Sequence, residues 1–495
     1  MRTVPASRHP HILAVVAASL LVAACGGTSS PSPARTSPGS TPAPTAPGQT
    51  AAASQPPAPG QTATNQPTTF SQPAATSQPA TPLPTAPTQT VAPSLSAKAA
   101  CGTYSGPPVK ISFAMWGDTT ELANQQKIVD AFRALNPTIP VTVTVADWTS
   151  YWPKLQTDLA GGNAPDVFLM DGPLFPDYQT RDQLLDLTPF IARDGFDTTQ
   201  LADLAVKDFQ SADGVQYGLP RDLNTIALFY NKTMFDTAGI SYPDASWDWA
   251  KLVEVATKLT KPAGAPNQWG FYTETSDMEN YWSSLVWQAG GDILSPDKKT
   301  VVIDSDQAAA GIQFLQDLIY KDKVMAQPVP GGTGDAFENG QAAMEADGSW
   351  LVPTHQAAGL NFGVAPLPKG PAGQATSVNP SGVVVYKGPK SPDAAWEFVK
   401  CYTGPQMQAK IAELKASMPV NVQVLNGQYA TSFDGGKTFA DALSYAHLKP
   451  SFKGYDEWST TLQDELDAKV CNDNQLSAKA ALDEITPQLQ QLLGQ

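Results

Sequence analysis

The chain has 495 residues and an acidic balance, with 46 Asp and Glu against 31 Lys and Arg and a formal net charge of −15. This charge excludes general electrostatic attraction to nucleic acid or to an anionic membrane surface as the basis of binding. The four histidines and four cysteines form no CxxC or HExxH motif, and no Gly-rich phosphate loop is present. We therefore expect no metal and no cofactor.

The first residues predict export. Arg2 and Arg8 precede an apolar run over residues 12–24, which is shorter than the roughly 20 residues that a membrane-spanning helix needs. The order of charged, apolar and small residues is typical of a cleavable signal peptide over residues 1–24. The sequence Val-Ala-Ala-Cys-Gly at 22–26 resembles a bacterial lipobox, so we expect Cys25 to carry the lipid anchor. An ordinary secreted protein with a cysteine in its signal is the alternative.

A long polar segment follows the cysteine. Residues 28–100 consist mainly of Pro, Ser, Thr, Ala and Gln, and Arg35 and Lys98 are the only charged side chains there. Such a segment cannot bury enough apolar surface to offset its ordering entropy. We expect residues 25–105 to be the anchor and a disordered linker, whose composition would suit O-glycosylation. The anchor would hold the protein at the outer face of the bacterial cytoplasmic membrane.

Strand and helix patterns alternate from residue 109 onward. Residues 109–115 and 141–145 have strand composition, and residues 121–135 between them have apolar side chains at helical spacing. Strand, helix and strand in this order predict a parallel sheet. A helix over 151–160 and a strand over 166–170 continue the pattern, and a helix over 184–191 follows.

The alternation continues to the end of the chain, which predicts the α/β class. Further strands are expected at 226–230, 362–365 and 382–386, and further helices at 247–259 (capped by Ser246), 308–320, 394–402, 406–414, 457–470 and 477–493. The roughly 395 residues after the linker exceed one ordinary hydrophobic core, so two lobes are expected.

Three cysteines remain in the folded part. An oxidising compartment permits one disulfide, and Cys401 with Cys471, both on expected helices, is the expected pair. Cys101 would then be free. Three unpaired thiols are the alternative, because spacing alone does not establish the geometry of a disulfide.

Five stretches of the chain resemble one family in their order and spacing. They are Gly-Asn-Ala-Pro-Asp-Val at 162–167, Tyr-Gly-Leu-Pro-Arg-Asp at 217–222 with its continuation through 228–232 to Ser-Trp at 246–247, Gln-Ala-Gly-Gly at 288–291, Phe-Glu-Asn-Gly at 337–340 running to Gly-Ser-Trp at 348–350, and Phe-Gly-Val-Ala-Pro-Leu-Pro at 362–368. This set resembles the family 1 extracellular solute-binding proteins, the maltose-binding-protein-like receptors of bacterial ABC importers.

The resemblance implies a two-lobed, type II periplasmic-binding-protein-like fold with crossing hinge strands and a ligand cleft that closes between the lobes. Lobe 1 would comprise residues 106–223 and 378–440, and lobe 2 residues 224–377 and 441–495. The implied function is capture of a sugar or oligosaccharide by a monomer, which delivers it to the transmembrane subunits of an ABC permease.

Candidate ligand contacts follow the expected strands, because ligands of α/β sheets lie beyond the carboxyl ends of the strands. These candidates are Trp116, Asp118, Asp147, Trp148 and Asp171, together with Arg221, Asp222 and Asn224 near the crossover. Aromatic rings pack on the C–H faces of a sugar, and carboxylates accept hydrogen bonds from its hydroxyls. Capping of the next helix is an equally good explanation of Asp118. Arg221 could pair with Asp222 or with a ligand carboxylate, which leaves acidic sugars open.

Six further candidates complete the expected site. They are Trp350, where the resemblance implies a stacking ring of lobe 2, with Glu274, Trp282, Asn379, Ser381 and Trp458. A turn at Asn379 is the plain alternative for that residue. The tryptophans at 247, 249, 269 and 396 are expected in the core.

Other classes of function are alternatives to a sugar receptor. A carbohydrate-processing lipoprotein needs two carboxylates at a fixed separation, and the resemblance places the acids on opposing mobile lobes. His355 and His447 lie in no nucleophile motif, so no catalytic residue is expected. A binding protein for another solute (polyamine, peptide, polyol phosphate or iron) and a sensor or adhesin that presents ligand to a receptor are the remaining alternatives.

Overall fold

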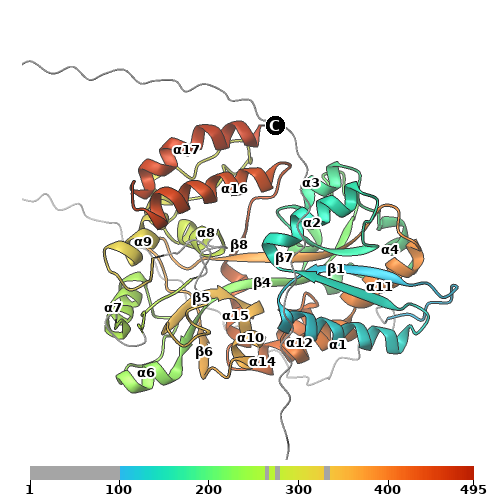
Figure 1. Ribbon diagram of the computed structural model, residues 1–495, viewed down its shortest axis with the longest axis horizontal. Coiled ribbons are helices and arrows are strands. Elements are labelled where there is room, and N and C mark those ends of the chain that lie inside the picture. The colour runs from blue at the N-terminus through green and yellow to red at the C-terminus, as the bar shows by residue number, and fades with distance from the viewer. Residues whose placement is uncertain (1–100, 262–266, 274–278, 328–334, 495) are drawn as a thin grey trace, which may run out of the picture. The chain divides into compact units, whose positions relative to one another are not determined.

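The computed structural model describes residues 101–261, 267–273, 279–327 and 335–494 (Figure 1). The expected signal peptide, the expected lipidation site Cys25 and the linker up to residue 100 lie outside the described residues. Among the described helices, none is both long enough and apolar enough to cross a membrane.

Three parallel strands form one side of the sheet and confirm the expected strand–helix–strand order. They are β1 (Ile111–Trp116), β2 (Val141–Ala146) and β3 (Val167–Asp171), and their spatial order is β2-β1-β3. Helices α1 (Thr119–Leu135) and α2 (Trp148–Ala160) follow the first two strands. Because parallel strands end at the same edge of a sheet, the residues that follow these three strands come together there.

Two long strands connect this part of the sheet to the rest. They are β4 (Gly218–Asn231) and β7 (Thr376–Val385), which pair antiparallel from Gly218 with Val384 to Thr225 with Val378. Beside β3, β7 completes the first side of the sheet, while the far half of β4 pairs with β5 (Met344–Gly348) and β6 (Phe362–Ala365). The short strand β8 (Ala446–Leu448) pairs with β7.

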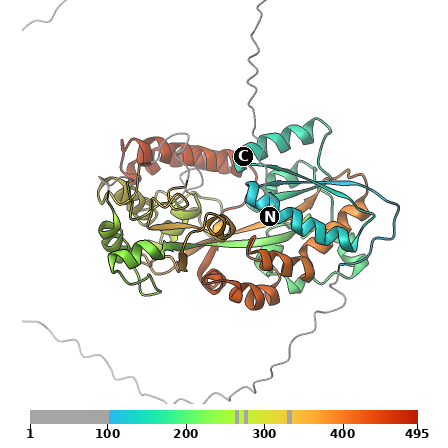
Figure 2. The same ribbon diagram turned by 60° about the horizontal axis from the view of Figure 1, so that its bottom comes forward.

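Helices gather at both ends of the crossing strands. The remaining ones are α3 (Phe175–Thr180), α4 (Thr188–Asp194), α5 (Asp203–Lys207), α6 (Lys232–Ala238), α7 (Trp249–Leu259), α8 (Glu279–Gln288), α9 (Asp306–Tyr320), α10 (Val352–Ala357), α11 (Pro392–Thr403), α12 (Pro405–Leu414), α13 (Val422–Val424), α14 (Ala430–Ser432), α15 (Gly436–Ala442), α16 (Tyr455–Leu466) and α17 (Ala478–Leu493). In Figure 1, α1 to α4 and α11 lie at one end of β4 and β7, and α6 to α9 with α16 and α17 lie at the other. Figure 2 shows the same grouping from a second direction. Two lobes joined by crossing strands are therefore the architecture, as the resemblance implied.

Several elements differ from the sequence prediction. The expected helix at 184–191 begins only at Thr188, because Leu184 instead forms a bridge with Tyr386. Helix α8 was not predicted, since nine of its ten residues are buried and it has no exposed polar face to mark its period. The cap of α7 is Asp248, whose side chain accepts a hydrogen bond from the Lys251 N–H, and not Ser246.

The segment before β8 packs against both lobes. Gln428 donates from its side-chain amide to the carbonyl of Ala409 on α12, at 3.0 Å. A few residues later, Asp434 forms an ion pair of 2.7 Å with Lys232 at the start of α6. The expected lobe boundary at residue 440 falls inside the next helix, α15.

The disulfide joins Cys101 to Cys401, with 4.4 Å between their Cα atoms, and Cys471 is buried and free. The expected pairing of Cys401 with Cys471, and the expected free thiol at Cys101, are therefore wrong. Cys401 lies on α11 at the β1 end of the crossing strands, whereas the helical segment that carries Cys471 packs with α9 and α17 at the other end. Composition and helical spacing do not reveal which lobe a helix joins.

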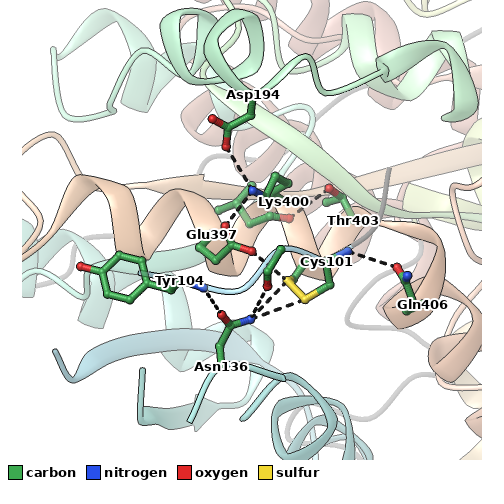
Figure 3. The surroundings of a disulfide bond; sticks show 11 residues. Cys101, Tyr104, Asn136, Asp194, Glu397, Lys400, Thr403 and Gln406 are labelled. Atoms are coloured by element: carbon green, nitrogen blue, oxygen red, sulfur yellow. Dashed lines mark hydrogen bonds and ion pairs between the residues drawn. A yellow bond between two sulfur atoms is a disulfide. The ribbon is translucent and has the colours of Figure 1, made fainter. Parts of the chain in front are cut away.

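Asn136, at the C-terminal end of α1, fixes the segment that carries Cys101 (Figure 3). Its side-chain amide donates to the carbonyl of Gly102 at 3.1 Å, and its carbonyl oxygen accepts from the Tyr104 N–H at 2.7 Å. Residues 101–104, which the sequence places at the end of the linker, are thus fastened to α1 and α11.

We expect the double variant Cys101→Ser/Cys401→Ser to lose about 2–5 kcal/mol of unfolding free energy in denaturant titrations, because the disulfide closes a loop of 300 residues. Adding a reductant should lower the stability of the unaltered protein to the same level and leave the variant unchanged. Equal stability of the unaltered protein with and without reductant would contradict this pairing.

Candidate functional site

A cavity of about 460 Å³ lies where the ends of β1, β2 and β3 meet the crossing strands. Its lining comes from both lobes and consists of Trp116, Gly117, Asp118, Glu121, Asp147, Trp148, Thr149, Asp171, Arg221, Asp222, Asn224, Asn280, Trp350, Leu351, Asn379, Ser381, Ala416, Ser417 and Lys449. We call it the interlobe cavity.

A second cavity of about 180 Å³ adjoins the first. The two share Trp148, Asp171 and Lys449 in their linings. The second adds Leu174, which directly precedes α3, and residues from α2, α8 and α16, namely Trp152, Glu279, Tyr455, Asp456, Ser459, Thr460, Gln463 and Asp464. We call it the side cavity, and the two together the cleft.

Eleven of the fourteen expected ligand contacts line the interlobe cavity. These are Trp116, Asp118, Asp147, Trp148, Asp171, Arg221, Asp222, Asn224, Trp350, Asn379 and Ser381. They lie on strands or shortly after them, and Trp350 follows β5. The rule that ligands bind beyond the ends of strands therefore identified residues that are far apart in the sequence. Glu274 lies outside the described residues.

Trp282 and Trp458 lie in the packed interior and line neither cavity. Trp458 has no exposed surface, and its indole N–H donates to the carbonyl of Leu489 at 3.1 Å, which fixes α16 on α17. Trp282 is 2% exposed and donates to the side chain of Gln463 at 3.3 Å. Helix packing explains both rings, and the expectation that they contact ligand has no support in this geometry.

Aromatic rings form one wall of the cleft. The ring centroids of Trp116 and Trp148 lie 5.2 Å apart at an interplanar angle of 86°, and Trp152 lies 5.5 Å from Trp116. Trp148 is 39% exposed, which is unusual for so large an apolar ring. Trp152 was not predicted, although its spacing of four residues from Trp148 on α2 places both rings on one helix face.

Trp350 faces this wall from the other lobe, where it follows β5. Its indole folds back over Gly348, and a Cβ at that glycine would lie 2.2 Å from the ring. The glycine is therefore required for the position of the ring. The partly exposed Trp350 completes an arrangement in which each lobe contributes at least one indole.

Asp118 and Asp147 cap helices and line the interlobe cavity at the same time. Asp118 and Glu121 form a capping box at the start of α1, with hydrogen bonds of 2.7 and 2.9 Å. The second carboxylate oxygen of Asp118 accepts from the Thr354 hydroxyl of α10 at 3.3 Å. The Ser150 N–H donates to Asp147 and lowers the pKa of that carboxyl. Both explanations weighed for Asp118 are thus compatible with its place.

Arg221 and Asp222 form a buried ion pair of 2.9 Å in β4. Neighbours in a regular strand point to opposite faces, but the register of β4 shifts between Pro220 and Asp222, which allows the two side chains to meet. Arg221 also donates to the Tyr402 hydroxyl at 3.2 Å. Burial raises the pKa of Asp222, and the guanidinium opposes this rise. Arg221 therefore pairs with Asp222 and not with a carboxylate of a ligand.

Polar groups of the crossing strands line the floor of the cavity. The Asn224 side-chain oxygen accepts from the Ser349 hydroxyl at 2.7 Å and from the Met418 N–H at 3.0 Å. Asn379 pairs with Asn224 across the two strands, and Ser381 pairs with Asp222. The chain continues as a strand through Asn379, so the turn expected as its alternative does not form.

Five charged residues of the cleft were missed, namely Glu121, Glu279, Lys449, Asp456 and Asp464. Lys449, just after β8, lies 3.5 Å from the carboxylate of Glu279 at the start of α8. Tyr455 also donates to Glu279. The strand before Lys449 has only three residues and α8 has no polar face, so neither element gave a signal in the sequence.

Asp171 ends β3 and lines both cavities. Its side chain is buried with the residue only 7% exposed, yet neither carboxylate oxygen receives a hydrogen bond from any residue that the structure describes. Burial raises the pKa of Asp171 to about 7, Lys449 opposes the rise, and Asp208 adds to it. Asp208 stands directly behind Gly172, where a Cβ would lie 1.8 Å from its carboxylate.

Comparison with known proteins agrees with this geometry. Residues 127–433 match the sequence profile of the bacterial extracellular solute-binding proteins. The maltotriose-binding protein of Pyrococcus abyssi is 27% identical over 340 residues, which are 67% of this chain and 70% of the relative. A maltooligosaccharide ABC transporter solute-binding lipoprotein of Streptococcus pneumoniae is 24% identical over 325 residues, or 63% and 71% of the two chains.

Solved structures share the fold. The ABC substrate-binding protein of Listeria monocytogenes in complex with cycloalternan has a TM-score of 0.72 at 27% identity, covering 79% of this chain and 99% of that one. The GacH receptor of Streptomyces glaucescens has a TM-score of 0.70 at 24% identity, covering 78% and 99%. The chain therefore belongs to the bacterial extracellular solute-binding protein family and has the type II, maltose-binding-like fold of its sugar receptors.

Proposed function

We propose that this protein is the extracytoplasmic substrate-binding lipoprotein of an ABC transporter, which captures a sugar or oligosaccharide and delivers it to the permease. The observation that carries the proposal is the interlobe cavity, where indoles from both lobes meet carboxylates and amides. Relatives named for binding maltotriose and maltooligosaccharides support a carbohydrate as the guest.

The aromatic and the polar lining residues would recognise different parts of the sugar. Trp116 and Trp148 on one side and Trp350 on the other would pack against the C–H faces of the sugar rings. Asp118 would accept hydrogen bonds from the hydroxyls of the sugar, and the side-chain amide of Asn379 would donate to them. Because the two sets of rings come from different lobes, both would contact one guest only when the lobes close on it.

Hinge closure is favoured by how the lobes are connected. The crossing strands β4 and β7 are fully buried and paired, so they resist local unfolding while they allow a small change of angle. At the rim, the described contacts between lobes include the Asp118–Thr354 hydrogen bond and one of 3.2 Å from Lys415 to Gln356. Part-buried hydrogen bonds from Ser451 and Gly454 to residues 172 and 177 also join the lobes. Each exposed polar contact contributes little to stability. Binding energy would then set the closed population.

The remaining parts of the proposal concern anchoring and delivery. Residues 1–24 would be removed, Cys25 would hold the lipid, and residues 25–105 would tether a monomer to the outer face of the membrane. Residues 106–223 and 378–440 would form lobe 1, and residues 224–377 and 441–495 lobe 2. The family and its structural neighbours are binding proteins, and we propose that this chain carries out no catalysis either.

A thermal-shift screen of the purified protein against a carbohydrate library tests the function. A guest that binds the folded state raises the unfolding midpoint by mass action, and a concentration of about 100 times Kd contributes about 2.7 kcal/mol. We expect at least one sugar or oligosaccharide to raise the midpoint. If no carbohydrate does so while a peptide or a polyamine does, the sugar assignment is wrong.

Truncating the facing indole tests the site. We expect Trp350→Ala to weaken binding of that sugar by about 1–3 kcal/mol, a roughly 5–150-fold rise in Kd by calorimetry, because the guest loses its apolar contact with lobe 2. The matched control is Trp249→Ala, which removes an indole stacked on Phe314 outside both cavities and should leave Kd unchanged. Unchanged affinity in Trp350→Ala would make that ring a purely structural one.

A further inference from the structure

The cleft holds more negative charge than its cations neutralise. Five carboxylates line the interlobe cavity and three more line the side cavity. Among the described lining residues, the cations are Arg221 and Lys449, and each already lies against a carboxylate, Asp222 and Glu279 respectively. The other six acids of the cleft therefore form no ion pair with a described lining residue.

Asp171 is the acid whose position points to a ligand. It belongs to both linings, it is more than nine-tenths buried, and no described residue donates a hydrogen bond to its carboxylate. Buried polar groups are almost always paired, and one that is not usually marks a functional constraint. The open space in front of Asp171 is the cleft itself, so the missing partner is expected to arrive with the guest.

The rings beside Asp171 also favour a cation. Trp148 lines both cavities together with Asp171, and it meets Trp116 and Trp152 edge to face at centroid distances of 5.2 Å. Trp148 also remains 39% exposed, and the face of an indole attracts an ammonium group. A carboxylate and exposed indoles around one space are a suitable environment for such a group.

We infer that the guest is an amino sugar or an oligosaccharide that contains one, with its ammonium group bound by Asp171 beside Trp148. This inference rests on the proposed function as a sugar receptor and specifies the class of sugar. Closure on a neutral sugar would move the carboxylates of the cleft further from water, whereas an ammonium group compensates part of that cost. A phosphorylated or carboxylated sugar would meet repulsion in the same space.

The charges around Asp171 predict the pH dependence. Burial raises its pKa to about 7, Asp208 from the end of α5, Glu279 from α8 and Asp222 from β4 add to the rise, and Lys449 opposes it. An ammonium group prefers the ionised carboxylate, so binding should expel a proton near pH 7. Affinity for an amine that stays protonated over this range, such as a 6-amino-6-deoxy sugar, should therefore rise from pH 6 to pH 8, whereas a neutral sugar gives no such rise.

Calorimetry with matched pairs of sugars tests the inference. The probes are maltotriose against its 6-amino-6-deoxy derivative, and the N-acetylglucosamine trisaccharide against the glucosamine trisaccharide. In at least one pair we expect the amine to bind at least 10-fold more tightly at pH 7.5 and low salt, with a preference that shrinks as salt is added. Equal or tighter binding of the neutral members overturns this inference and leaves the sugar receptor intact. Binding by neither pair also overturns it, and the carbohydrate screen then decides the proposed function separately.

The variant Asp171→Asn assigns the effect to one carboxylate. It keeps an acceptor for a hydroxyl but removes the charge, so we expect the preference for the amine to fall at least 10-fold. The control Asp203→Asn removes the same charge from an exposed ion pair on α5, outside both cavities, and should keep the preference. A preference that persists in Asp171→Asn overturns the assignment.

Thermal unfolding without ligand shows that the variant folds and checks the state of the acid. A carboxyl whose pKa is raised on folding lowers the stability of the protein as the pH rises from the unfolded-state pKa to the folded-state pKa, and the full loss is present above the folded-state pKa. Asp171→Asn should therefore unfold roughly 2–4 °C above the unaltered protein at pH 8, and the difference should shrink toward pH 5.5 as Asp171 takes up its proton. A variant less stable than the unaltered protein at pH 8 would contradict an ionised, uncompensated Asp171.

Discussion

The antiparallel pairing of β4 with β7 is the constraint on which the rest of this structure depends. All residues of both strands are buried, and their register brings Asn224 opposite Asn379 and Asp222 opposite Ser381 at the centre of the molecule. One end of the pair carries β3 and the parallel strands, and the other carries β5 and β6. The cavity forms at the crossing because the polar ends of β1 to β3 stop there, and a guest bound there contacts both lobes.

Electrostatics gives the crossing its chemical character. The bulge in β4 turns Arg221 toward Asp222, so the buried guanidinium is neutralised within its own strand. Asp171 lies at the same edge of the sheet but has no such partner among the described residues. A binding protein gains from this asymmetry, because a satisfied pair fixes the scaffold while an unsatisfied acid reserves its hydrogen bonds and its charge for the guest.

How much of this could be predicted depends on the range of each signal. Trp116, Trp148 and Asp171 could be found from the sequence because each directly follows an apolar strand, which is a local pattern. Lys449 and Glu279 could not, since the packing of α8 on β7 and the pairing of β8 with β7 bring them to the cleft. The predicted disulfide pairing was wrong for the same reason. Helical spacing placed Cys401 and Cys471 on helices, but it did not indicate which lobe each helix joins. The expectation for Trp458 was wrong because a tryptophan near the start of a helix looks the same in a sequence whether its ring faces a cleft or a core.

The central claim is that a carbohydrate guest is held between indoles of two lobes at the crossing strands. A crystal structure of the protein with a bound oligosaccharide measures this directly. The account predicts density in the interlobe cavity, with Trp116 or Trp148 on one face of the guest, Trp350 on the other, and the Asp171 carboxylate within hydrogen-bonding distance. A guest bound on the outer surface of one lobe, with this cavity empty, would contradict it.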